Sequence, residues 1–145
     1  MIWLNDTDIR PVCTQEDLEV LAQATDAYKN SAEARTISFF KGYLGRYDVD
    51  EIFADNGGQV PDPDTRNASL VMFVVDYFLY ILYGGQPDRL IPDIRVRRYE
   101  EAVKWLEGIQ KGKVSPDLPT VDTDEETDVN SSFRWGSADR VTSSW

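Results

Sequence analysis

The side chains best suited to catalysis or metal binding in this 145-residue sequence are carboxylates, and many of them lie in one segment. Paired carboxylates can hydrolyse glycosides, and clustered carboxylates can hold a hard cation such as Ca²⁺. A calcium loop also needs a glycine at its sharp turn and a bidentate glutamate at its twelfth position, and this segment has neither in place. We therefore interpret it as a solvated acidic loop rather than a metal site. Its acidic residues are Asp48, Asp50, Glu51, Asp55, Asp62 and Asp64.

Asp76 is the carboxylate in the middle of a long apolar run, Ala68–Tyr83. A carboxylate in apolar surroundings needs a partner, because an unpaired buried charge is strongly destabilising. We expect a structural ion pair or a hydrogen-bonded carboxylate rather than a catalytic group. The candidate partners are Arg46, Arg66, Arg97 and Arg98, with Arg46 and Arg98 favoured because each lies beside the apolar stripe of a helix.

Other catalytic arrangements have no residues to build them. The sequence contains no histidine, which excludes Ser-His, Cys-His and histidine-ligated metal sites within the chain. It also lacks a Gly-x-Ser-x-Gly elbow and a Gly-x-x-x-x-Gly-Lys-Ser/Thr phosphate loop. We predict that the chain is not an enzyme and that it uses no cofactor and no metal.

The net charge of −11, from 15 basic and 26 acidic residues, limits the kinds of partner that the chain can bind. Proteins that grip nucleic acid need a basic surface, so sequence-specific binding to DNA or RNA is not expected. Non-adhesive contact with DNA that slides past remains compatible with an acidic surface. Arg95, Arg97 and Arg98 form a small basic cluster. This cluster either meets an acidic neighbour or balances charge within the chain, and the sequence leaves both alternatives open.

Cys13 is the sole cysteine, so no disulfide can form within the chain. The first residues, beginning Met1-Ile2-Trp3-Leu4, lack the basic and apolar regions of a secretory signal. We expect a protein that resides in a reducing cytoplasm.

Four segments carry the start signals and the periodicity of helices. Thr14 and Thr25 each offer a hydroxyl that can accept hydrogen bonds from the first amides of a helix. Pro92 suits a first helical turn, and Gly112 suits a helix end. The expected helices span about 14–24, 25–47, 68–83 and 92–112. They predict an all-α fold, a compact four-helix domain.

Two of these helices have apolar stripes that should face the core. The stripe of the second helix comprises Ala27, Ala34, Ile37, Phe40 and Leu44. The stripe of the last helix comprises Tyr99, Ala102, Val103, Leu106 and Ile109.

The segment Asp48–Asn67 predicts a long loop between helices, because Gly57-Gly58, Pro61 and Pro63 interrupt it. A helical turn is expected within it at residues 50–53. Loops of this length often form an interacting surface.

The apolar run Ala68–Tyr83 is open to three interpretations. A membrane span would need about 18–20 apolar residues without a charge in the middle, and this run is shorter and contains Asp76. Its early β-branched residues leave a buried strand as a minor alternative. We favour a central core helix that stops at Gly84-Gly85, and we expect no contact with a membrane.

The composition changes near residue 119, where Thr, Ser and Asp become frequent. We therefore divide the chain into a helical domain, residues 1–118, and an extended C-terminal arm, residues 119–145, that starts with the acidic block Asp122–Asp128. Large aromatic residues in such an arm usually exist to dock on a protein. The candidate interaction residues in the arm are Phe133, Arg134, Trp135 and Trp145.

Several strings of residues within Leu18–Pro119 resemble the Mu-like phage connector family. The most specific string is made of four parts in order along the chain. They are Arg98-Tyr99-Glu100-Glu101, Trp105-Leu106, Lys111-Gly112-Lys113 and Pro116-Asp117-Leu118-Pro119. The others are Tyr43-Leu44-Gly45-Arg46-Tyr47-Asp48, Asp76-Tyr77-Phe78-Leu79-Tyr80 and Ile91-Pro92. The arm segment Phe133-Arg134-Trp135-Gly136-Ser137 is also similar to the tails of such proteins. The acidic insertion around Gly57–Asp64 and the long acidic linker depart from the family pattern.

This resemblance implies a helical head-completion or head–tail connector protein without enzymatic activity. Such a protein is a virion structural subunit of the phage neck, and it is present in the host cytoplasm during assembly. It would form a homo-oligomeric ring between the portal protein and a tail-side connector or terminator protein, lining or surrounding the DNA exit path. A dodecamer is the expectation by analogy with connectors in general. The alternative is a monomeric protein-binding adaptor or regulatory module of phage or prophage origin.

Overall fold

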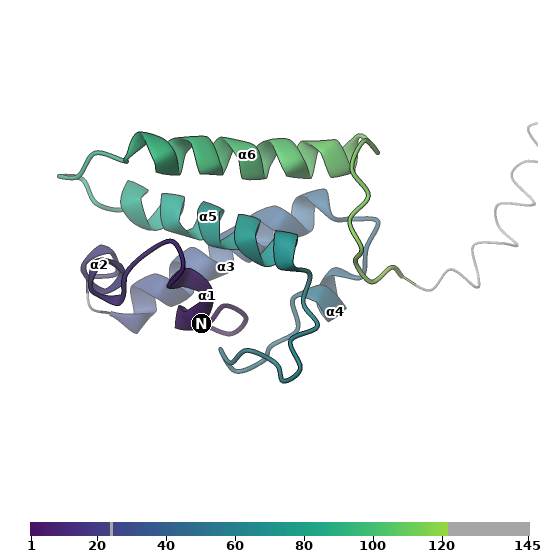
Figure 1. Ribbon diagram of the computed structural model, residues 1–145, viewed down its shortest axis with the longest axis horizontal. Coiled ribbons are helices and arrows are strands. Elements are labelled where there is room, and N and C mark those ends of the chain that lie inside the picture. Colours follow the sequence, from purple (N-terminus) through teal and green to yellow (C-terminus); the bar gives the residue numbers. More distant parts are fainter. Residues whose placement is uncertain (24, 122–145) are drawn as a thin grey trace, which may run out of the picture.

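The computed structural model describes residues 1–23 and 25–121, and six helices account for their regular structure (Figure 1). The four longer helices are α2 (Gln15–Leu21), α3 (Asp26–Tyr43), α5 (Ala68–Gly84) and α6 (Asp93–Gln110). Two single-turn helices complete the set, α1 (Asp6–Ile9) and α4 (Val49–Ile52). The part of the chain that the structure describes contains no β-strand, so the predicted all-α fold is confirmed.

Side-chain hydrogen bonds mark the starts of α1, α2, α4 and α5, but not those of α3 and α6, and the cap predicted at Thr25 is not formed. The Thr14 hydroxyl accepts from Asp17 N at 3.1 Å, as its sequence context predicted. The Asn67 side chain accepts from Leu70 N at 3.0 Å and starts the apolar helix α5. Asn5 and Asp8 form a reciprocal capping box at α1, a helix that the sequence did not predict. The other short helix, α4, lies where a helical turn was expected.

Helix α5 is the centre of the domain. It forms an antiparallel hairpin with α6 and also packs against α3, while α3 and α6 make a smaller contact with each other (Figure 1). Leu70, Val74, Phe78 and Leu82 are buried along α5, which agrees with the predicted core helix. None of the helices in the described residues combines the length and the apolarity that a membrane span requires.

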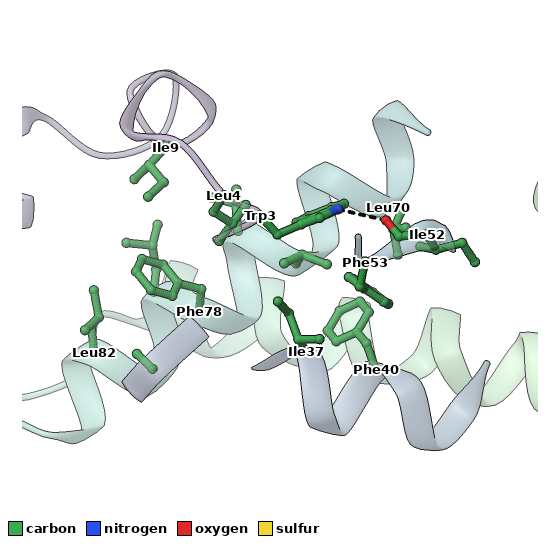
Figure 2. Packing of buried hydrophobic residues seen from close by; sticks show 14 of the residues in the cluster. Trp3, Leu4, Ile9, Ile37, Phe40, Ile52, Phe53, Leu70, Phe78 and Leu82 are labelled. Carbon is green, nitrogen blue, oxygen red and sulfur yellow. Dashed lines mark hydrogen bonds between the residues drawn. The ribbon is translucent and has the colours of Figure 1, made fainter. Parts of the chain in front are cut away.

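The apolar stripe of α6 was predicted correctly, since Ala102, Leu106 and Ile109 are buried. The prediction of the core-facing stripe of α3 was wrong in part, because Ala27 and Ala34 are exposed. Ile37 and Phe40 do face the core (Figure 2). The buried face of α3 is rotated toward Glu33, a residue that hydrophobic periodicity would place outside the core.

Glu33 is buried because it binds the backbone at the start of the chain. Its carboxylate accepts hydrogen bonds from the amides of Ile2, Trp3 and Leu4 at 2.7, 3.0 and 2.7 Å. This holds the indole of Trp3 in the core, where its Nε1 donates to Ile52 O at 2.8 Å (Figure 2). The N-terminal segment is therefore fixed to both α3 and α4.

Candidate protein-interaction surface

Asp76 lies on the buried side of α5, where only 3% of its side chain is exposed. Its Oδ1 is 3.8 Å from Arg98 Nη1 on α6, and that oxygen accepts no hydrogen bond from the described residues. Burial raises the pKa of Asp76, while the positive charges of Arg98 and Arg95 offset part of this rise. The geometry is that of a loosely paired structural carboxylate.

Of the two favoured partners for Asp76, the structure brings Arg98 close and leaves Arg46 elsewhere. Arg46 is exposed, and its Nη1 would lie 3.8 Å from a Cβ placed on Gly112, at the far end of α6. The sequence placed Arg46 beside an apolar stripe, but α3 ends at Tyr43, so Arg46 follows the helix instead of extending its face.

The arginine cluster at the start of α6 is divided by its contacts. Arg95 donates a hydrogen bond to Val12 O, and Arg98 is paired with Asp76. Arg97 is exposed. Two of the three arginines therefore bind within the chain, and Arg97 is the one that faces solvent. The arm residues Phe133, Arg134, Trp135 and Trp145 lie outside the described residues.

The carboxylates of the acidic loop are engaged locally. Asp48 caps α4 by accepting from Glu51 N at 3.0 Å, and Asp55 accepts from Gly57 N at 2.8 Å. Asp50 is 3.2 Å from the Lys41 ammonium. Within residues 1–23 and 25–121 no three ligand side chains are grouped so that they could hold a metal ion. Cap and turn formation accounts for Asp48 and Asp55, and an exposed ion pair accounts for Asp50.

Arg66 connects this loop to the N-terminal segment, a role that the sequence did not indicate. Its guanidinium, with 7% of the side chain exposed, is 2.9 Å from carboxylate oxygens of both Asp8 and Asp64. It also lies over the Trp3 ring, 5.2 Å from the centroid. Burial opposes the charged form of Arg66, but the bonds to Asp64 and Asp8 outweigh it and raise the Arg66 pKa. The hydrogen bond from Arg66 lowers the pKa of Asp64.

An open groove with aromatic walls crosses α3, α5 and α6, and we call it the aromatic groove. Its volume is about 750 Å³, and it is open to solvent along its length. Its walls include Arg35 and Phe39 of α3, Tyr77, Tyr80 and Gly84 of α5, and Tyr99 of α6.

The rings of the aromatic groove stack on one another across the three helices. Phe39 and Tyr77 lie with centroids 4.5 Å apart and planes 20° apart, and Tyr80 and Tyr99 lie 3.9 Å and 16° apart. Tyr77 joins the two pairs, because its centroid is 5.3 Å from that of Tyr99. Burial raises the pKa of Tyr77 above its ordinary value. The groove is a preformed surface of stacked rings, which suits aromatic or cationic side chains.

Sequence reasoning did not predict this groove, although a signal for it was present. Tyr77 and Tyr80 are three residues apart on one helix and therefore share a face. Both belong to the string Asp76–Tyr80, and Tyr99 belongs to the string that follows Arg98. Three of the residues that line the aromatic groove, Tyr77, Tyr80 and Tyr99, therefore belong to the strings that resemble the family.

A second candidate contact surface is the turn between α5 and α6, at the left end of the molecule in Figure 1. Leu90 in this turn is 94% exposed, and Ile94 at the start of α6 is 45% exposed. A leucine contributes little to its own fold when it is this exposed. We call Leu90 and Ile94 the apolar turn.

The fold and these surfaces define a small all-α protein with an open aromatic groove and an exposed apolar turn. Sequence comparison gives its family. The chain belongs to the family described as Bacteriophage Mu, Gp36, whose model matches residues 59–134, just over half of the 145 residues. It is therefore a Mu-like bacteriophage protein. No curated protein and no solved structure matches the chain.

Proposed function

We propose that this phage protein is a non-enzymatic virion structural protein, a head–tail connector subunit that forms a ring between the portal protein and a tail-side connector or terminator protein. The observation that carries the proposal is the extent of the family match. It covers α5, the apolar turn, α6 and the arm as far as Arg134. The family match thus includes the apolar turn and the α5 and α6 walls of the aromatic groove, while the α3 wall lies before its start.

The surfaces of the described residues support a role in assembly. A ring subunit needs at least two contact patches, because each copy meets a neighbour on either side. The aromatic groove, which extends as far as Gly85, and the apolar turn that follows it offer two neighbouring patches. Each has the aromatic or apolar side chains that are enriched at interface centres.

The charge of the chain supports a place near the DNA path. Two of the three clustered arginines bind within the domain, and the whole chain carries a net charge of −11. Such a surface repels phosphates and lets DNA pass without adhesion. The proposal therefore locates the protein at the head–tail interface of the virion.

The proposal is tested by the oligomeric state of the full chain, with and without the portal protein of the same phage. Native mass spectrometry should find a ring, with twelve copies as the expected number, either alone or on the portal. A chain that stays monomeric and ignores the portal would contradict the connector role and favour the monomeric adaptor. Loss of a hydrolytic activity on changing Asp76, in a folded variant, would contradict the non-enzymatic assignment.

A further inference from the structure

We propose that the arm segment Phe133-Arg134-Trp135 docks into the aromatic groove of its own chain. The aromatic groove would then be the binding site for a segment that lies outside the described residues. The inference does not depend on the connector role, since it concerns contacts within a single chain.

The chemistry of the aromatic groove matches that of the segment. Tyr80 and Tyr99 already cover one face of each other, so a ring of Phe133 or Trp135 would pack against the surfaces of these two rings that line the groove. Arg134 can lie over a tyrosine face, and Arg35 can in turn lie over an indole. A volume of about 750 Å³ leaves room for more than one such side chain.

Gly84 provides the space for this contact. A Cβ added at Gly84 would meet no atom within 4 Å, although Gly84 lines the groove. The packing of the domain therefore does not require a glycine at position 84. A larger residue at this position would fill the groove from within and leave the fold intact.

The arm is long enough to reach. The described chain leaves the domain beside Tyr47, which pairs with Thr120 just after the end of α3. From Tyr43 back to Arg35 the distance along α3 is about 12 Å. Residues 122–132 can span at most about 36–40 Å when extended, so Phe133 can reach the whole groove of its own chain. A tether of this length also gives a high effective concentration, which favours the same chain over a neighbour.

The charges of the arm and of the groove, and the range of the family match, both support the arm segment as the ligand of the groove. The acidic block Asp122–Asp128 lies between the exit point and Phe133, and the exposed Arg35 at the groove offers it a cation. The family match includes this block and ends at Arg134, so the segment up to that residue is part of the matched unit along with α5 and α6.

Photocrosslinking in the full chain tests the proposal. Phe133 is replaced by the photoreactive p-benzoylphenylalanine, and crosslinked peptides are mapped by mass spectrometry in an equal mixture of ¹⁴N and ¹⁵N chains. We expect crosslinks to peptides that contain Arg35–Phe39 or Tyr77–Gly84, joining residues of equal isotope content. Gly84→Leu should lower their yield by roughly tenfold or more, as loss of an interface anchor does.

Gly42→Leu is the matched control. Gly42 lies on α3, is exposed and would also accept a Cβ without contact, but it does not line the groove. Its crosslinking yield should stay near that of the parent chain, and circular dichroism should show both variants folded. Crosslinks elsewhere, no crosslinks, or a groove yield unchanged by Gly84→Leu would overturn the proposal. Crosslinked pairs of which about half join ¹⁴N to ¹⁵N, the share that contacts between randomly mixed chains give, would assign the groove to a neighbour's arm and would overturn the same-chain assignment.

Discussion

Glu33 Oε1 accepts a hydrogen bond from Leu4 N at 2.7 Å, and the same oxygen accepts one from Trp3 N at 3.0 Å. With the further bond from Ile2 N to Oε2, one side chain of α3 satisfies three successive backbone amides. The N-terminal segment contains no regular structure before α1. These three amides therefore depend on a single carboxylate that stands in for a hydrogen-bonded strand or helix partner.

Glu33→Ala should lower the free energy of unfolding by about 3–5 kcal/mol, because it leaves buried amides without acceptors. Chemical denaturation monitored by tryptophan fluorescence gives the value. Glu100→Ala is the control, since Glu100 is exposed on α6 and its loss should cost less than about 0.5 kcal/mol. Equal stabilities of the two variants would show that Glu33 does not anchor the segment.

Arg66→Ala should destabilise the fold by about 3 kcal/mol or more, because the buried Asp8 loses its cation and Trp3 loses the guanidinium above its ring. Arg66→Lys should recover part of this loss, since an ammonium cannot bind both carboxylates in the same bidentate manner. Arg89→Ala, at an exposed position in the α5–α6 turn, is the control and should be neutral. Thermal melts of the three variants decide, and a neutral Arg66→Ala would contradict the proposed connection.

Asp76→Asn should gain stability relative to the parent chain as the pH rises. The pKa of Asp76 is raised in the folded protein, so the folded state holds its proton longer than the unfolded state does. The parent chain then loses stability from its ordinary pKa of about 3.8 up to its folded pKa, at up to about 1.4 kcal/mol for each unit of the rise. Asparagine does not titrate and escapes this loss.

The measurement for Asp76 is the free energy of unfolding of both chains between pH 4 and pH 8. The difference between variant and parent should grow with pH and then level off above the folded pKa. A difference that stays constant over this range would mean that Arg98 and Arg95 fully compensate the burial of the carboxylate.

Leu90→Ser should leave stability within about 0.5 kcal/mol of the parent, because a 94% exposed side chain contributes little to the fold. If the apolar turn is an assembly contact, the same change should weaken ring formation or portal binding at least roughly tenfold. Val60→Ser, at an exposed apolar position in the loop before α5, is the matched control and should assemble normally. Native mass spectrometry of the two variants checks this, and equal assembly would remove Leu90 from the interface.

Much of the fold could be predicted from the sequence, because its helices carry local signals. Thr14 begins a helix through its own side chain, and the favoured interpretation of the run Ala68–Tyr83, a core helix, agrees with α5. The family resemblance drawn from the strings around Asp76 and Arg98 is supported by the family match. The connector function, the partners and the non-enzymatic role stay predictions.

The features that escaped prediction depend on contacts between distant residues. Glu33 meets Leu4 across 29 positions, and Arg66 meets Asp8 across 58. No local pattern marks such pairs, and hydropathy places both charged residues at the surface. The aromatic groove is similar, because Phe39, Tyr77 and Tyr99 come from three helices whose relative rotation the sequence does not specify.

The central position of α5 also bears on how the chain folds as it is synthesised. Helices α1 to α4 precede α5 in the chain, yet the apolar faces of α1 and α3 pack against it. A nascent chain that ends before residue 68 has Trp3 and Ile52 but lacks that central helix. The apolar surface of the N-terminal half therefore stays exposed during synthesis until α5 has emerged from the ribosome. A chain that stalls or is truncated before α5 is accessible to chaperones and proteases through this surface.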